Sequence, residues 1–360
     1  MTATPAPTTS SARPTVALVL PAYNEAALVQ QSLRILCDYM AARDAEYDWD
    51  IVLVNDGSAD DTAALADEFA RTNPHVTVLH HPVNFGMGQA LITAFRHTHA
   101  DYLVTLDLDL SFAPDHIGAL LTAIRKTGAK VVVASPFAKG GRMSNVPWLR
   151  EAASRWANRF LARVANVRLT SITGVGRAYD GPFVRSLNLK ATGMDINPEV
   201  IFKAMMLQAR VVEIPAHLDW GFQLASGPAR RSKMRIGRHV VSTLVSGFVL
   251  RPTHFFLIPG LVLLAFSLYT NVWMFIHWWT EFSALGHHTW FLDRASEATR
   301  ESFRLNPHTF VIGGLSMVAA FQILGLAFLS LQQKKYFEEL FHLGIGLNAR
   351  LRREDETPKS

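Results

Sequence analysis

The sequence predicts an α/β domain built on a mostly parallel sheet, followed by interfacial helices and two transmembrane helices. Four apolar runs that end in polar residues alternate with segments of helical periodicity, as in a parallel sheet covered on both faces. Charged residues make up only 18% of the 360 residues, fewer than a soluble enzyme usually carries. Two stretches near the C-terminus are long and free of formal charge. Part of the chain is therefore expected in lipid.

In the α/β part, four expected strands alternate with four expected helices. The apolar runs are TVALVLPAYNE, DIVLVNDGSADDT, DYLVTLDLD and AKVVVAS, and the helical patterns cover 26–41, 60–71, 88–98 and 114–127. The site of such a sheet lies outside the carboxyl ends of its strands. Polar and acidic residues follow the first three runs, so we expect them to meet in one crevice.

The two charge-free stretches, 254–279 and 310–331, each exceed the roughly 20 residues that span a bilayer as a helix. Basic residues precede the first and follow the second, whereas the loop 280–307 has no basic excess. The positive-inside rule then predicts a multi-pass protein of the cytoplasmic (inner) membrane, with the catalytic domain and both termini cytosolic. The basic residues are Arg230, Arg231, Lys233, Arg235, Arg238 and Arg251 before, and Lys334, Lys335, Arg350, Arg352 and Arg353 after.

Composition divides the chain into five parts. The first 14 residues are rich in Pro, Thr, Ser and Ala and lack the apolar core of a signal peptide, so they are expected to be a disordered tail. The other expected parts are the α/β domain at 15–230, an interfacial amphipathic helix at 231–252, the two-helix transmembrane region at 253–335 and a cytosolic tail at 336–360. The stretch 146–167 also mixes basic and apolar residues as an interfacial helix would.

Several classes of site are excluded. The sequence has no GxxxxGK[ST] loop, no GxGxxG fingerprint, no HExxH and no nucleophile elbow. The single cysteine, Cys37, excludes an intramolecular disulfide and a cysteine-based metal cluster. Nucleic-acid binding is disfavoured because the basic residues cluster at the expected membrane flanks.

Asp107 and Asp109 follow the third apolar run with one residue between them. Carboxylates at the end of a buried strand are costly unless they are paired, and a hard cation such as Mg²⁺ or Mn²⁺ suits oxygen ligands. Such an ion commonly bridges a carboxylate and a diphosphate. Without a phosphate-binding loop, this pair predicts a metal-held nucleoside diphosphate leaving group, and hence glycosyl transfer from a nucleotide sugar.

These motifs resemble the family-2 glycosyltransferases of the GT-A fold, and more closely the polyprenyl-phosphate (dolichol-phosphate) sugar synthases. The matching stretches are LPAYNEAALV, VNDGSADDT, NFGMGQAL, LDLDLS, KGGRMSNVPWLREAASRWAN and VVEIPA, with RRSKMRI before the membrane. The resemblance implies a GT-A domain at 15–230, a nucleotide-sugar donor, a polyprenyl-phosphate acceptor and an inverting reaction. A lipid phosphate is already anionic, which fits the lack of an obvious general base.

The resemblance also assigns roles to residues. It implies catalytic roles for Asp107, Asp109 and Arg150, with Ser111 beside the two aspartates at the metal where relatives often carry Gln. The nucleotide sugar is expected at Pro21, Tyr23, Glu25, Asp56, Gly57, Asn84 and Asp107. The lipid phosphate is expected at Lys139, Arg142, Arg150, Ser154, Arg177, Arg231 and Lys233. Arg177 lies in LTSITGVGRAY, a loose form of a family motif without its Asp.

Two alternatives stay open, as does a homo-oligomeric assembly. A polysaccharide synthase-like enzyme would use another acceptor, but FQLASGPARR lacks the QxxRW tryptophan and two spans are few for a channel. A non-catalytic membrane scaffold or nucleotide-sugar sensor could keep the fold. The intact Asp107–Asp109 pair and the Arg150–Ser154 pair, four residues apart on one helix face, argue against it.

Overall fold

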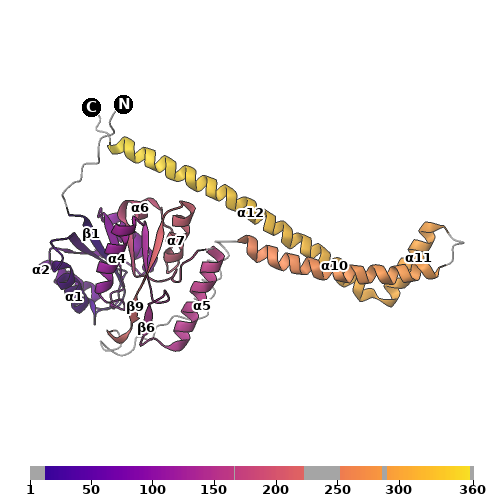
Figure 1. Ribbon diagram of the computed structural model, residues 1–360, viewed down its shortest axis with the longest axis horizontal. Coiled ribbons are helices and arrows are strands. Elements are labelled where there is room, and N and C mark those ends of the chain that lie inside the picture. The colour runs from indigo at the N-terminus through magenta and orange to yellow at the C-terminus, as the bar shows by residue number, and fades with distance from the viewer. Residues whose placement is uncertain (1–12, 166, 223–251, 286–289, 357–360) are drawn as a thin grey trace. The chain divides into compact units, whose positions relative to one another are not determined.

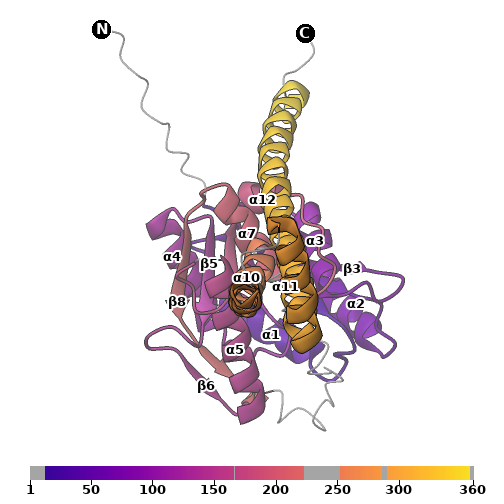
Figure 2. The same cartoon turned by 90° about the vertical axis from the view of Figure 1, so that its right-hand side faces the viewer.

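The computed structural model describes residues 13–165, 167–222, 252–285 and 290–356. The chain divides into two compact units on either side of residue 247. The first unit is an α/β domain and the second is a set of long helices (Figures 1 and 2). The expected interfacial helix at 231–252 lies almost entirely outside the described residues.

The first unit is built on a seven-stranded sheet of order β3-β2-β1-β4-β7-β5-β8. Neighbouring strands are parallel except at β7, which is antiparallel to both β4 and β5. A small parallel pair, β6 and β9, stands apart from it. The strands are β1 Thr15–Ala22, β2 Asp48–Asn55, β3 Val76–His80, β4 Tyr102–Thr105, β5 Val131–Ser135, β6 Arg142–Ser144, β7 Arg177–Asp180, β8 Val211–Pro215 and β9 His217–Asp219.

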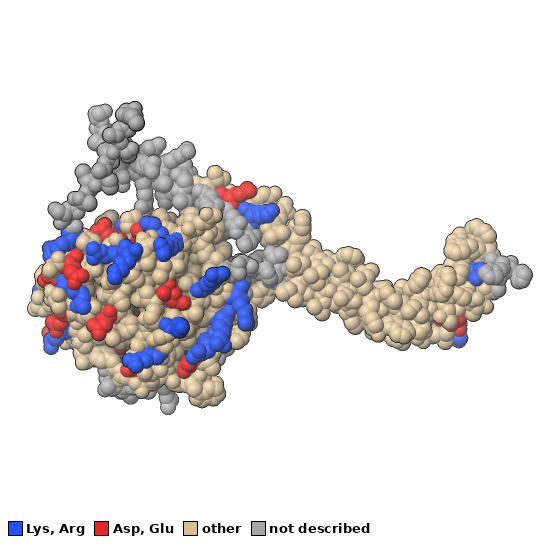
Figure 3. Space-filling view, in the orientation of Figure 1, with Lys and Arg blue, Asp and Glu red and all other residues tan. Residues whose placement is uncertain are grey.

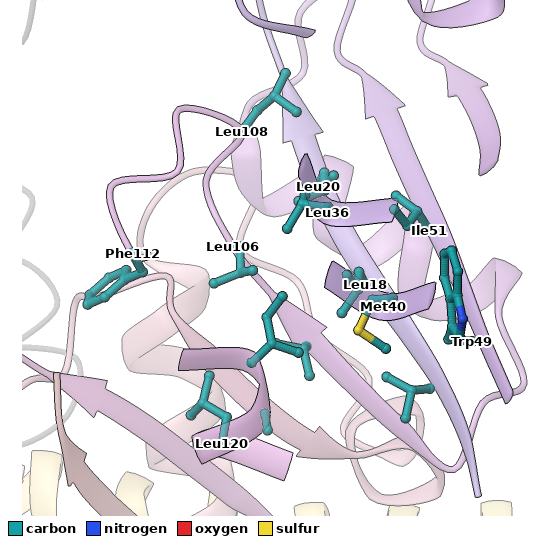
Figure 4. Packing of buried hydrophobic residues seen from close by; sticks show 14 of the residues in the cluster. Leu18, Leu20, Leu36, Met40, Trp49, Ile51, Leu106, Leu108, Phe112 and Leu120 are labelled. Carbon is teal, nitrogen blue, oxygen red and sulfur yellow. The ribbon is translucent and has the colours of Figure 1, made fainter. Parts of the chain in front are cut away.

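Helices cover both faces of this sheet. Side chains alternate between the two faces of a strand, and the even-numbered β1 residues Leu18 and Leu20 join a buried cluster with α1, α2 and α4 (Figure 4). On the other face, Phe95 of α3 meets Tyr179 of β7 edge to face at 5.5 Å. The helices are α1 Val29–Ala41, α2 Thr62–Thr72, α3 Met87–His97, α4 Asp115–Thr127, α5 Trp148–Ala165, α6 Gly181–Ser186 and α7 Ile196–Met206.

The predicted strands and helices are present. The four apolar runs form β1, β2, β4 and β5, and the four helical patterns form α1 to α4. The short strands β3 and β7 were not predicted from the apolar pattern. β7 carries Arg177 and Asp180 within four residues, so no apolar run marks it, and its place depends on pairing with β4 and β5.

The second unit consists of α10 Pro252–Ala284, α11 Phe291–Leu305 and α12 Pro307–Glu356. Two segments, Phe255–Ala284 and Pro307–Gln333, are long and apolar enough to cross a membrane. Only 11% and 17% of their most apolar windows are buried, unlike the core helix of a soluble protein. The expected loop 280–307 contains the helix α11, and α12 continues into the expected C-terminal tail.

Helices α10 and α12 lie side by side and share a polar contact (Figure 1). The Asn271 amide donates to the Gly313 carbonyl at 3.1 Å, and the buried Ser267 hydroxyl donates to the same oxygen at 3.4 Å. A Cβ at Gly313 would lie 3.2 Å from the Asn271 amide nitrogen. A small residue on one helix therefore lets a polar side chain of the other reach its backbone, a common way for apolar helices to associate.

We expect Asn271→Leu to lower the free energy of unfolding of the detergent-solubilised protein by about 1 kcal/mol, because it removes this interhelical hydrogen bond. Denaturant titration followed by circular dichroism measures the change. Thr280→Val is the matched control, since the Thr280 hydroxyl donates within its own helix, to the Ile276 carbonyl. Equal losses of unfolding free energy in Asn271→Leu and Thr280→Val would contradict a stabilising role for the Asn271–Gly313 hydrogen bond.

Candidate active site

The carboxyl ends of β1, β2 and β4 meet at one edge of the sheet. Ala22 and Asn55 are paired in register, and the Asp56 N–H donates to the Ala22 carbonyl at 2.9 Å. Val19 pairs with Thr105, and the Leu106 N–H reaches the Val19 carbonyl at 3.3 Å. The polar residues that follow these three strands therefore lie side by side, as the parallel topology requires.

The segments after β1 and β2 are joined by side chains. The Asn24 N–H donates to the Ser58 hydroxyl at 2.9 Å, and the Asn24 side-chain oxygen accepts from the Ala59 N–H at 2.8 Å. The Glu25 N–H donates to the Thr62 hydroxyl at 2.7 Å. These bonds fix the backbone around Tyr23, whose ring is 42% exposed at this edge. Pro21, also expected to line the nucleotide pocket, is the penultimate residue of β1.

Asp56 holds the segment that carries Asn84. Its two carboxylate oxygens accept from the Phe85 N–H at 3.0 Å and the Gly86 N–H at 2.8 Å. The neighbouring Gly57 has φ +64°, and a Cβ there would lie 2.3 Å from the Val83 carbonyl carbon. Glycine is thus required at this close approach of two backbones.

A largely enclosed histidine, with 9% of its side chain exposed, orients Asp56. The His81 Nδ1 lies 2.7 Å from an Asp56 oxygen, and its Nε2 lies 2.9 Å from the Thr93 hydroxyl. The carboxylate can only accept, which assigns a proton to Nδ1; in the neutral imidazole Nε2 then accepts from Thr93. Sequence reasoning missed His81, because the strand β3 that precedes it was not recognised.

Asp107 and Asp109 lie in a tight turn directly after β4. The Leu110 N–H donates to the Asp107 carbonyl at 3.2 Å, and Leu110 has a φ of +51°. An Asp109 carboxylate oxygen accepts from the Ser111 N–H at 3.0 Å. We call residues 107–110 the acidic turn. The turn brings both aspartates to the edge where the β1 and β2 segments meet.

The acidic turn concentrates negative charge. Burial, and then the nearby Asp109 and Glu25 carboxylates, raise the pKa of Asp107 to about 8. Like charges disfavour ionisation unless a cation compensates them. In the described ranges, no group of three or more His, Cys, Asp or Glu side chains is arranged to hold a metal by itself. Two carboxylates fit a hard cation that takes further ligands from substrate phosphate and water. Ser111, the third expected ligand, is buried.

The residues expected at the lipid phosphate lie on β6, on the loop before it, and on α5. Lys139 and Arg142 are exposed, and Arg142 begins β6. Arg150, Ser154 and Asn158, each four residues apart, share one face of α5. The Arg150 guanidinium lies 5.1 Å from the centre of the Trp220 ring. These residues thus gather on one side of the domain.

Arg177 and the segment before the membrane complete the expected set. Arg177 is fully buried, and its guanidinium donates to the carbonyls of Gly174 at 2.8 Å, Asn197 at 3.0 Å and Ile172. Burial lowers the pKa of Arg177. Its expected phosphate contact stays a prediction, since these carbonyls occupy the guanidinium here. Arg231 and Lys233 lie outside the described residues.

Comparisons with known proteins agree with this geometry. Residues 17–182 match the family model for glycosyl transferase family 2. The undecaprenyl-phosphate mannosyltransferase of Micrococcus luteus is 34% identical over 56% of this chain and 82% of its own length. The polyprenol monophosphomannose synthase of Mycolicibacterium smegmatis is 34% identical over 46% and 64% of the two chains. The dolichol-phosphate mannosyltransferase of Pyrococcus furiosus is 29% identical over 56% and 55%.

Among solved structures, glucosyl-3-phosphoglycerate synthase from Mycobacterium tuberculosis with Mn²⁺, UDP and phosphoglyceric acid has a TM-score of 0.48 and 18% identity, covering 65% of this chain and 78% of that one. The mostly parallel sheet and the acidic turn, together with the family match, define a glycosyltransferase with a GT-A-like fold. The chain belongs to glycosyl transferase family 2, which confirms the expected family, fold class and enzyme class.

We expect Asp56→Ala to cost about 3 kcal/mol of the free energy of unfolding and to weaken nucleotide-sugar binding at least tenfold. The substitution leaves the N–H groups of Phe85 and Gly86 without their charged acceptor. Chemical denaturation and calorimetric titration measure the two effects. Asp61→Ala is the control, because the exposed Asp61 makes no capping bond at α2. Unchanged donor affinity in Asp56→Ala would contradict this role.

Proposed function

We propose that this glycosyltransferase moves a sugar from a UDP- or GDP-sugar onto a polyprenyl phosphate, with inversion at the anomeric carbon. The product would be a polyprenyl-phosphate sugar for cell-envelope or protein glycosylation. One observation carries the proposal: the acidic turn is connected through Asp219 and Trp220 to Arg150 on the inner face of α5. The names of the relatives, which specify undecaprenyl, polyprenol and dolichol phosphates, support the same acceptor class.

The connection runs from Ser111 to Arg150. The Ser111 carbonyl, one residue after the acidic turn, accepts from the Asp219 N–H at 2.8 Å. The next residue, Trp220, places its ring against the Arg150 guanidinium. The Trp220 N–H also reaches the Ser144 carbonyl of β6 at 3.3 Å, in the strand that Arg142 begins. These contacts support the proposal that a site for a diphosphate and a site for a second phosphate adjoin each other.

The donor side of this site is acidic. Asp107 and Asp109 would hold a divalent Mg²⁺ or Mn²⁺ together with the diphosphate of the nucleotide sugar. The bound ion would neutralise the negative charge that develops on the departing diphosphate. Tyr23, Glu25, Asp56, Gly57 and Asn84 surround the same edge and would bind the nucleotide through the backbone that Asp56 fixes.

The acceptor side positions a nucleophile that needs no base. Arg150 and Ser154, with Lys139 and Arg142 nearby, would hold the lipid phosphate by charge-assisted hydrogen bonds and offset its repulsion from the donor diphosphate. An oxygen of the lipid phosphate then forms a bond to the anomeric carbon. The bond from that carbon to the diphosphate breaks, and its electron pair leaves with the nucleoside diphosphate. Holding the two substrates in line accounts for most of the catalysis.

The outer face of α5 suits a membrane surface. Trp148 is 74% exposed and Trp156 is 47% exposed, and Arg155, Arg159 and Arg163 lie on the same side. Figure 3 shows Lys and Arg side chains gathered over this part of the domain. Aromatic and basic residues together favour the headgroup layer of an anionic membrane. The acceptor tail can then stay in lipid while its phosphate reaches Arg150.

We expect Arg150→Ala to lower kcat/KM for the lipid acceptor 10- to 100-fold, because it removes a charged hydrogen-bond donor. Asp109→Ala should lower transfer at least 100-fold. The measurement is transfer of radiolabelled sugar from a panel of UDP- and GDP-linked mannose and glucose to undecaprenyl phosphate by the detergent-solubilised protein, with Mg²⁺ or Mn²⁺.

Arg155→Ala is the matched control, since Arg155 lies on the outer face of α5 and pairs with Glu151. It should keep near wild-type transfer in detergent. Label in a polymer or protein fraction, with none in lipid, would support another acceptor. Tight nucleotide binding without turnover would support a sensor or scaffold.

We also expect the α10–α11 connection to lie outside the cell and the catalytic domain inside. Ser296→Cys on α11 should react with a membrane-impermeant maleimide in intact cells, and Asp61→Cys only after permeabilisation. Burial, and then Asp38, raise the pKa of the native Cys37 to about 11, so its thiol is protonated and reacts slowly near pH 7. The reverse labelling pattern would contradict this orientation.

A further inference from the structure

The segment 170–176, between α5 and β7, is held by side chains from three different elements. The Glu213 carboxylate of β8 accepts from the Thr170 N–H at 2.9 Å and the Ser171 N–H at 2.7 Å. The Asn158 side-chain oxygen of α5 accepts from the Ile172 N–H at 2.6 Å and the Thr173 N–H at 3.0 Å. Arg177 of β7 donates to carbonyls of the same segment. Side-chain hydrogen bonds thus hold residues 170 to 174 of this segment.

This segment is attached to the strand that leads into the acidic turn. The hydroxyl of Thr105, the last residue of β4, donates to the Val175 carbonyl at 2.6 Å. The Ala134 N–H of β5 donates to the Gly176 carbonyl at 2.9 Å. A Cβ at Gly176 would lie 2.9 Å from the Phe112 ring, three residues after Asp109. Segment 170–176 is therefore attached to both sides of the acidic turn, through Thr105 before it and Phe112 after it.

Asn158 joins this segment to the acceptor helix. It is 1% exposed, and its amide nitrogen donates to the Ser154 carbonyl at 2.9 Å, one turn earlier on α5. The same face carries Arg150 one further turn away. Among residues 148–163 of α5, the buried ones are Ala157, Asn158 and Leu161. Only two of these buried side chains are apolar, and one is an alanine, so directed hydrogen bonds contribute much to the rotation and height of the helix.

We propose that Asn158 is a positioning residue that sets Arg150 and Ser154 against the acidic turn, and thereby the distance between the two phosphorylated substrates. The proposal rests on the proposed function, since the acceptor side of the site is assigned there. Asn158 touches neither substrate. It acts through α5 on one side and through segment 170–176 and Thr105 on the other.

The kinetic test compares two variants of the full chain in detergent. Asn158→Leu keeps the approximate size but loses both hydrogen-bonding groups, and it should lower kcat/KM for undecaprenyl phosphate at least tenfold. Asn158→Asp keeps the acceptor oxygens but loses the donor to Ser154, and it should fall between Asn158→Leu and the wild type. Calorimetric affinity for the nucleotide sugar should stay within twofold of wild type in both.

Leu33→Ala is the control for lost stability, because Leu33 is fully buried in α1, in a part of the core that carries no proposed acceptor residue. It should lower the melting temperature without a selective effect on the acceptor. An acceptor kcat/KM within twofold of wild type in Asn158→Leu and Asn158→Asp would overturn the proposal. Equal losses in donor affinity and acceptor kcat/KM, as for a merely structural residue, would also overturn it.

A distance measurement separates this proposal from the proposed function. Spin labels on Ala152→Cys of α5 and Asp61→Cys beside α2, in a Cys37→Ser background, report where α5 lies within the domain. The distance distribution should be narrow in the parent and in Leu33→Ala, and broadened or shifted in Asn158→Leu or, if that variant does not fold, in Asn158→Asp. If the wild type transfers no sugar to polyprenyl phosphate, the proposed function fails while this distribution still decides the role of Asn158. An unchanged distribution would overturn it.

Discussion

Repulsion among carboxylates at one edge of the sheet is the constraint on which the site depends. The parallel register of β1 and β4 brings Asp107, Asp109 and Glu25 together, and their charges add to the cost of burying Asp107. A protein tolerates such an arrangement where a cation compensates it, and otherwise one carboxyl group stays protonated. The acidic turn therefore offers carboxylate oxygens whose ionisation a bound divalent ion would favour, at the edge where the proposed diphosphate would lie. Arg150 on the inner face of α5 would be the electrostatic complement that the proposed second phosphate requires.

The loops around this edge are held by polar side chains in addition to apolar packing. Asp56, Asn158 and Glu213 each accept from two successive backbone N–H groups, in the segments 85–86, 172–173 and 170–171. Loops that surround a substrate cannot bury much apolar surface, because they must stay open on one side. The N–H groups of such loops still need hydrogen-bond acceptors. A single carboxylate or amide that accepts from two of these N–H groups also fixes the local backbone. Rigidity of the site thus follows from hydrogen-bond satisfaction.

The sequence was sufficient to predict most strands and helices of the sheet domain. It was insufficient to predict the side-chain hydrogen bonds that hold the loops. Long apolar runs predict β1, β2 and β5 because buried parallel strands have few alternatives for such residues. The same logic fails for β7, where a buried arginine and an aspartate interrupt the pattern. It also fails for α11, whose buried Ala298 and Ser302 are small and whose surface charges resemble those of a loop. Asn158 stood in a recognised motif, but its partners lie 14 and 15 residues further on, and no local pattern indicates such pairs.

The composition of α5 follows from the two surfaces that it must serve. Its inner face carries the polar residues Arg150, Ser154 and Asn158, as a face that meets a loop and the proposed phosphate site would require. Its outer face keeps Trp148 and Trp156 in contact with solvent, which costs free energy in water and is favourable in a lipid headgroup layer. A helix with so little apolar anchoring to its own domain can be placed accurately only by directed bonds. Under the proposed function, hydrogen bonding on one face of α5 and lipid contact on the other would allow the α/β domain to present Arg150 to a phosphate whose tail stays in the membrane.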